Sequence, residues 1–145
     1  MTALAVELLD AYRNTAYVVT EAPSPMVLNI GVHNQAAARL LQAQGLGSAL
    51  FITAHNPWGQ CLQPQENQSR HAQLVEELGP RWSLLSGFGV SPRGDWPAET
   101  GVLVLCDDTG LHEVWLQTYC QNAAVRITAD GEVTLLVNPS LPVIT

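Results

Sequence analysis

Lysine is absent from this sequence, and charged residues of both signs are scarce. The six basic residues are all arginines: Arg13, Arg39, Arg70, Arg81, Arg93 and Arg126. The lack of lysine excludes Schiff-base catalysis and a phosphate loop of the Walker type. Because the formal net charge is −7 and the arginines are dispersed, the chain cannot form the basic stripe that nucleic-acid binding usually needs. We therefore expect no nucleic-acid partner.

Cysteine is also sparse, and long apolar runs are missing. The chain has three cysteines, Cys61, Cys106 and Cys120, at long spacings and without a C-x-x-C pair. This pattern indicates neither a disulfide framework nor a zinc knuckle, and it suits a reducing compartment. No stretch approaches the length of a membrane span, and Glu7 and Asp10 lie where a secretory signal would carry positive charge. We expect a bacterial cytoplasmic protein that has no membrane partner.

Apolar residues, by contrast, make up 47% of the 145 positions. A chain of this length fits one domain, residues 1–145, that can bury a core without a metal or a disulfide. Only 13% of the residues are charged, so the surface must depend on glutamine, asparagine, serine and threonine for solubility. The weakly charged surface leaves room for a protein partner.

Periodicity and turn signals predict the order of the elements. Helices are expected over 2–13, 35–44, 66–78 and 111–121. Strands are expected over 17–20, 26–31, 48–53, 82–90 and 100–107, followed by a hairpin over 124–137 around Asp130-Gly131. This order lacks regular βαβ alternation, so we predict an α/β (α+β) sandwich of two or three layers. Its mixed, largely antiparallel sheet would have six to seven strands and about four flanking helices.

The stretch 52–78 is unusual, because amides, two histidines and an arginine separate an apolar strand from a helix. On that helix, the predicted buried face carries Leu74, Val75 and Leu78. Followed toward the N-terminus, the same face carries Asn67, Arg70 and His71. His55 and Asn56 come directly after the strand 48–53. These polar side chains should therefore point into the protein at one strand end and one helix N-terminus.

Such a junction favours an anion, because free backbone N–H groups and the helix dipole are directed at it. An inward guanidinium also needs a partner, since an unpaired buried charge is costly. The sequence thus predicts that Asn56, Asn67 and Arg70 form a polar crevice for a small anionic or nucleotide-like metabolite. Two alternatives stay open. Arg70 could form an internal salt bridge, for instance with Glu99, or the chain could be a non-catalytic protein-interaction module.

Several segments together resemble one known family. They are AYRNTAYVV at 11–19, ITAHNP at 52–57, QENQSRHAQL at 65–74, the G-x-G strand with a W-x-x-E element after it, and YCQNA at 119–123. The combination is similar to the bacterial domain-of-unknown-function family 3293, over nearly the whole chain. The family name supplies no activity. In the family pattern the position of His55 is often aromatic, which argues against a chemical role for this histidine.

The resemblance implies a set of characteristic positions: Thr53, Ala54, Asn56, Pro57, Glu66, Asn67, Arg70, Leu74, Glu99, Gln121 and Asn122. From this set we expect ligand contacts at Asn56, Asn67, Arg70, Glu99, Gln121 and Asn122. Asn122 also falls on the helical stripe of Leu111, Val114, Trp115 and Thr118, so its side chain should face inward. Whether any reaction is catalysed stays open. If one is, Glu99 is the candidate proton carrier.

Other chemistries find less support. His55, Cys61 and His71 lie near the predicted crevice, but their spacing matches no standard zinc site, and we expect no metal. A role for Cys61 as a nucleophile activated by either histidine stays open. Trp58 and Trp96 lie in irregular segments and are candidates for the wall of a pocket.

Overall fold

The computed structural model describes residues 6–22, 25–94 and 97–140. Its four helices are α1 (Val6–Asn14), α2 (Gln35–Gln44), α3 (Pro64–Leu78) and α4 (Thr109–Thr118). Its seven strands are β1 (Ala16–Val19), β2 (Met26–Asn29), β3 (Ser48–Thr53), β4 (Leu84–Val90), β5 (Glu99–Val104), β6 (Ala123–Thr128) and β7 (Val133–Val137). One 3₁₀ turn, Pro57–Gly59, follows β3.

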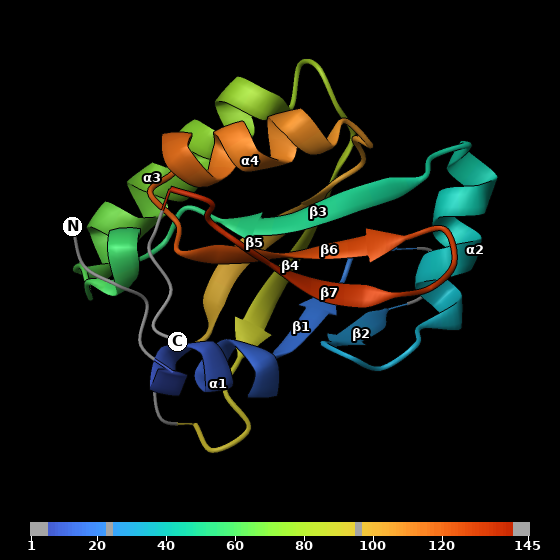
Figure 1. Cartoon of the computed structure of the whole chain (residues 1–145). Coiled ribbons are helices and arrows are strands. Elements are labelled where there is room, and N and C mark those ends of the chain that lie inside the picture. The colour runs from blue at the N-terminus through green and yellow to red at the C-terminus, as the bar shows by residue number, and fades with distance from the viewer. Residues whose placement is uncertain (1–5, 23–24, 95–96, 141–145) are drawn as a thin grey trace.

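The strands form one seven-stranded sheet in the order β2-β1-β4-β5-β3-β6-β7 (Figure 1). Every pair in the described chain is antiparallel, which confirms the largely antiparallel sheet that the sequence predicts. The sheet curls into a half-barrel. The segment after edge strand β2 contacts the other edge, through backbone bonds from Gly31 N–H to the Val133 carbonyl of β7, 2.9 Å, and from Asn34 N–H to the Gly131 carbonyl of the β6-β7 turn, 2.8 Å.

Strand β3 lies inside the sheet and is buried on both faces, as its continuous apolar run predicts. Successive side chains of a strand point to opposite faces. Leu50 and Ile52 accordingly join a cluster with Leu74 of α3 and residues of α4. On the other face, Phe51 joins a cluster that includes Leu41 of α2. In Figure 1, α3 and α4 lie together over one face, while α2 and α1 lie at other edges of the sheet.

Local signals for helix ends and turns are confirmed. Asn34 caps α2, because its side chain accepts a hydrogen bond from Ala37 N–H, and Gly45 ends that helix in the left-handed region with φ 68°. The predicted C-terminal hairpin is the β6-β7 pair, whose turn contains Gly131 with φ 86°. Helix α3 begins two residues earlier than predicted, because Pro64 occupies its first turn.

The buried faces of two helices differ in part from the sequence prediction. The buried residues of α3 are Asn67, Leu74 and Leu78, whereas Val75 is 39% exposed. In α4 the buried residues are His112, Trp115 and Leu116, and Val114 is 53% exposed. The buried face of α3 thus agrees with the predicted one except at Val75, whereas the buried stripe of α4 is displaced by about one residue from the predicted one. Apolar content alone did not fix which side packs against the sheet.

Some boundaries also differ. Helix α4 ends at Thr118 rather than at residue 121, because Cys120 adopts a left-handed conformation with φ 56° and turns the chain toward β6. The predicted first helix begins among residues 1–5, which lie outside the described part of the chain. Within the described residues, no helix has the length and apolar character needed to cross a membrane.

Candidate functional site

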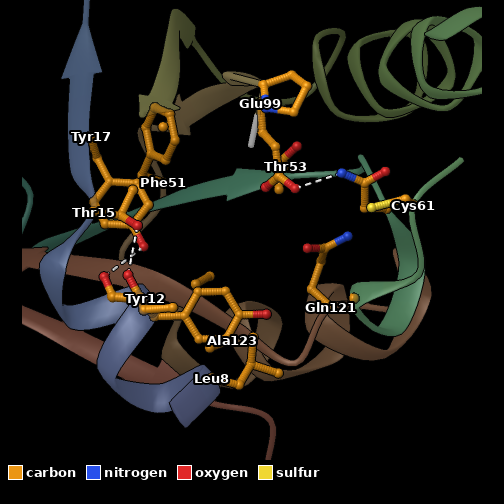
Figure 2. Close-up of a pocket in the computed structure, with 16 residues that line it drawn as sticks. Leu8, Tyr12, Thr15, Tyr17, Phe51, Thr53, Cys61, Glu99, Gln121 and Ala123 are labelled. Atoms are coloured by element: carbon orange, nitrogen blue, oxygen red, sulfur yellow. Dashed lines mark hydrogen bonds between the residues drawn. The ribbon is translucent and has the colours of Figure 1, made fainter. Parts of the chain in front are cut away.

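A cavity of about 220 Å³ lies between α1 and the sheet. We refer to it as the α1 pocket (Figure 2). Its apolar wall includes Leu8 of α1, Phe51 of β3 and Ala123 of β6. The aromatic rings of Tyr12 and Tyr17 also line it. The pocket is therefore formed by segments that are far apart in sequence and are brought together by the curl of the sheet.

Glycines on β4 and β5 make room for the aromatic rings. A Cβ atom at Gly89 would lie 3.3 Å from the Tyr17 ring. A Cβ atom at Gly101 would lie 3.0 Å from the Phe51 ring and 2.8 Å from the Ile52 carbonyl oxygen. At Gly101 the contact with the backbone oxygen is too close for a larger residue without movement of the sheet, whereas at Gly89 the Tyr17 ring would have to shift by a few tenths of an ångström. The absence of side chains at these positions lets the rings lie against the strands.

Asn56 and Asn67 hold the loop after β3 in an uncommon shape. Asn56 has φ 49° and ψ 64°, in the left-handed region that few residues other than glycine adopt. Its backbone N–H donates to Asn67 Oδ1, 2.9 Å, and Asn67 Nδ2 donates back to Asn56 Oδ1, 2.9 Å. Leu62 N–H donates to the same Asn56 oxygen, 3.1 Å. The predicted meeting of the two asparagines is therefore present, and they bind each other.

Arg70 connects the same loop to the end of α4. Its Nε donates to the Ala54 carbonyl, 2.6 Å, and its terminal nitrogen donates to the Tyr119 carbonyl, 2.8 Å. Gln121 completes this connection, because its Nε2 donates to the carbonyls of His55 and Tyr119, each at 3.0 Å. The guanidinium is thus hydrogen-bonded to two backbone carbonyls. It does not form the salt bridge with Glu99 that was one of the sequence alternatives.

Glu99 is the carboxylate of the α1 pocket. One of its oxygens accepts a hydrogen bond from Asn56 Nδ2 at 2.7 Å. Burial raises the pKa of Glu99, and the bond from Asn56 offsets part of that rise. Its other carboxylate oxygen has no hydrogen-bond partner among the described residues. Asn56 therefore links the loop geometry to the acid that faces the cavity.

The tyrosines beside the pocket are desolvated. Burial raises the pKa of Tyr12, the bond from Asn122 lowers it, and the charge of Glu99 raises it further. That bond joins Asn122 Nδ2 to the Tyr12 hydroxyl at 3.4 Å. Burial is also the main cause of the raised pKa of Tyr17, whose hydroxyl donates to the Tyr12 carbonyl at 3.0 Å. Both phenols therefore stay neutral at physiological pH.

His55 and His71 meet outside the pocket. Their ring centroids are 6.2 Å apart with an interplanar angle of 80°. His55 Nε2 and His71 Nδ1 are buried without hydrogen-bond partners among the described residues. Burial lowers the pKa of both rings, and for His55 the charges of His71 and Arg70 add to the effect. Cys61 lies apart from this pair, in the lining of the α1 pocket.

No group of three or more histidine, cysteine or acidic side chains with metal-site geometry occurs in the part of the chain that is described.

The six residues expected to contact a ligand fall into two groups. Asn56, Glu99 and Gln121 line the α1 pocket. Asn67, Arg70 and Asn122 are not in its lining. They hold the residues behind it, through the bonds described above. Their ligand-binding role stays a prediction.

The sequence reasoning missed the aromatic part of the site. Tyr12, Tyr17 and Phe51 line the cavity, whereas the expected aromatic wall residue Trp58 is 40% exposed and lies outside the lining. Trp96 is outside the described residues. A signal was present, because the segment AYRNTAYVV contains both tyrosines and the G-x-G strand provides the space beside them.

Comparison with known proteins yields one match. The model of the family described as "Protein of unknown function (DUF3293)" matches residues 52–124. This range is narrower than the resemblance over nearly the whole chain, but it includes the loop after β3, α3, Glu99 and Gln121. No curated protein and no solved structure matches the chain.

Proposed function

The chain belongs to the family described as "Protein of unknown function (DUF3293)", and from the geometry of its site we propose that the α1 pocket binds a small molecule. One observation carries the proposal. A cavity of about 220 Å³ with an apolar and aromatic wall is lined on one side by Asn56, Glu99 and Gln121. A mostly apolar cavity with a few convergent polar groups is the usual form of a ligand site.

The backbone around the pocket supports this proposal. Asn56 and Trp58 have positive φ, 49° and 54°, within three residues of each other. Non-glycine residues in this region cost about 1–3 kcal/mol each, and they persist only where the surroundings hold them. Asn67 supplies that support for Asn56. Strain of this kind often accompanies functional sites, because it fixes a side chain in a position that a relaxed loop would not give.

The size and charge of the pocket narrow the choice of ligand. Its volume is below the roughly 300–1,000 Å³ of sites for drug-sized molecules, so we propose a ligand smaller than a nucleotide. None of the described lining residues is arginine or histidine, and Arg70 is engaged with two carbonyls. A phosphate would therefore find no counter-charge here. We propose an uncharged or positively charged compound in place of the anionic or nucleotide-like one expected from the sequence.

A cavity-filling variant tests the proposal. Ala11 lines the pocket from α1, so Ala11→Phe should place a ring in the cavity, and Asp10→Phe adds the same ring at an exposed position of the helix. Thermal denaturation is measured against a panel of small metabolites. A compound present at 100 times its Kd stabilises the fold by about 2.7 kcal/mol. We expect such a shift in the wild type and in Asp10→Phe, and none in Ala11→Phe.

If no compound shifts the wild type, the proposal fails, and the alternative of a non-catalytic protein-interaction module takes its place. If the bound molecule reacts, Glu99 is the group in position to transfer a proton. We also propose a bacterial cytoplasmic location, because the free cysteines Cys61, Cys106 and Cys120 suit a reducing compartment. Cell fractionation with an antibody against the protein tests this location.

A further inference from the structure

Glu99 has one carboxylate oxygen with no hydrogen-bond partner among the described residues. Asn56 Nδ2 binds Oε1 at 2.7 Å, and no donor among the described residues reaches Oε2. Glu99 is partly buried, and it lines the α1 pocket. A carboxylate in such surroundings needs donors for its remaining lone pairs, or it is destabilised as an anion. The cavity is the open side from which a donor can come.

Gln121, which also lines the pocket, has free capacity of the same kind as Glu99. Gln121 uses its Nε2 for two carbonyls, which leaves its Oε1 without a donor among the described residues. Figure 2 shows its amide directed into the space between Glu99 and Tyr12. The free hydrogen-bonding capacity of these two side chains is thus for accepting. A ligand that fits them must donate.

The aromatic wall favours the same chemistry. Tyr12, Tyr17 and Phe51 line the cavity, and the faces of aromatic rings attract cations. The chain has no lysine, and no arginine or histidine is found in the described lining. Negative charge, acceptor oxygens and ring faces therefore occur together, and none of the described lining residues carries a positive charge to balance them.

We propose that the ligand of the α1 pocket is a small amine, held as an ammonium group by Glu99 Oε2 and Gln121 Oε1, with its apolar body against the tyrosine rings. This inference rests on the proposed function, because it names the chemical class that the pocket binds. The ammonium group and the Glu99 carboxylate form an ion pair with hydrogen bonds, and no covalent bond is made or broken. Charge-assisted bonds of this kind are about twice as strong as neutral ones.

Glu99→Gln is the variant that tests the inference. Glutamine keeps the shape of the side chain and an oxygen for the Asn56 bond, but it removes the negative charge. Because burial raises the pKa of Glu99, the ionised form destabilises the free protein, and this cost increases as pH rises through the folded pKa. We therefore expect Glu99→Gln to keep or raise the melting temperature at pH 8. Glu76→Gln, at an exposed position of α3, is the matched control.

The probes are sets of three compounds that share an apolar ring and differ in the polar group, such as benzylamine, benzyl alcohol and benzoate. Binding to the wild type, Glu99→Gln, Glu76→Gln and Ala11→Phe is measured by NMR titration at pH 7.5. We expect amines to bind the wild type and Glu76→Gln about ten-fold more tightly than the alcohols do. Glu99→Gln should remove this preference while the alcohol affinity stays within about three-fold. Ala11→Phe should weaken both.

The possible failures are distinguishable. Equal binding of amine and alcohol, or an amine affinity that Glu99→Gln leaves unchanged, would overturn the amine inference and leave the pocket proposal standing. Preferential binding of the carboxylates would overturn the inference in favour of an anionic ligand. If no member of the panel binds the wild type, or if Ala11→Phe binds as the wild type does, both the inference and the binding proposal are wrong.

Discussion

Replacing Arg70 with methionine should destabilise the fold without removing any direct contact to a ligand. The guanidinium donates to the carbonyls of Ala54 and Tyr119, at 2.6 and 2.8 Å. Arg70 thereby joins the loop after β3 to the C-terminal end of α4. Methionine keeps most of the aliphatic stem but has no donor for either carbonyl.

The expected magnitude follows from these two bonds. A hydrogen bond to a charged group contributes about 1.5–3 kcal/mol, so two give roughly 3–6 kcal/mol. The lower end applies, because Gln121 still donates to the Tyr119 carbonyl and because removal of the charge relieves part of its desolvation. We expect a loss of about 3 kcal/mol out of a total stability of about 5–15 kcal/mol. At about 2–4 °C per kcal/mol, the melting temperature should fall by about 6–12 °C.

Urea denaturation followed by tryptophan fluorescence measures this loss, since Trp115 of α4 is buried in the cluster that includes Leu74 of α3. Arg39→Met is the matched control, because Arg39 is an exposed arginine on α2, and it should change stability by less than about 0.5 kcal/mol. A loss below about 1 kcal/mol for Arg70→Met would refute the structural role described here. A stable Arg70→Met protein that no longer binds any compound would place Arg70 in the ligand site after all.

Two further predictions concern the residues around the loop. Asn67→Ala removes both hydrogen bonds to Asn56 and leaves the Asn56 backbone N–H without a partner, so we expect the free energy of unfolding in urea to fall by about 2–4 kcal/mol. A fall of under about 1 kcal/mol would contradict the conclusion that Asn67 holds the loop at Asn56. Because burial lowers the folded pKa of His55 and His71, these residues stabilise the fold above their unfolded pKa of about 6.5, and that stability is lost as pH falls through the folded values. From pH 7 to pH 5 the free energy of unfolding of the wild type should therefore fall by more than that of His71→Leu. An equal fall in both proteins would show that the pKa of His71 is the same in the folded and unfolded states.

The elements could be predicted from the sequence because their signals act over a few residues. The cap at Asn34, the left-handed Gly45 and the turn at Gly131 each depend on the backbone preferences of one residue and its neighbours. The burial of β3 on both faces follows from its apolar run. The exact limits of the buried helix faces were not predictable, since Val75 and Val114 are as apolar as their buried neighbours. Packing against the curled sheet determined which side faced inward.

Part of the site was also predictable. Helical periodicity places Asn67 on the inward stripe, and the short path from β3 to α3 brings it to Asn56. The partners of Arg70 were not predictable, because backbone carbonyls carry no signature in the sequence. One of them belongs to Tyr119, 49 residues away. A guanidinium inside a fold must find acceptors, but the sequence does not say whether a ligand or the main chain provides them.

The sequence by itself determined the strand and helix order, the family, the burial of the central strand and the inward asparagine, because these depend on local preferences and on periodicity. Only the tertiary structure decided that Arg70 is engaged with carbonyls and that Glu99 faces a cavity. It also decided that Tyr12, Tyr17 and Phe51 form the aromatic wall of that cavity. The physical reason is that the pocket is formed by the curl of an antiparallel sheet under α1. The curl results from all seven strands together, and no single segment encodes it.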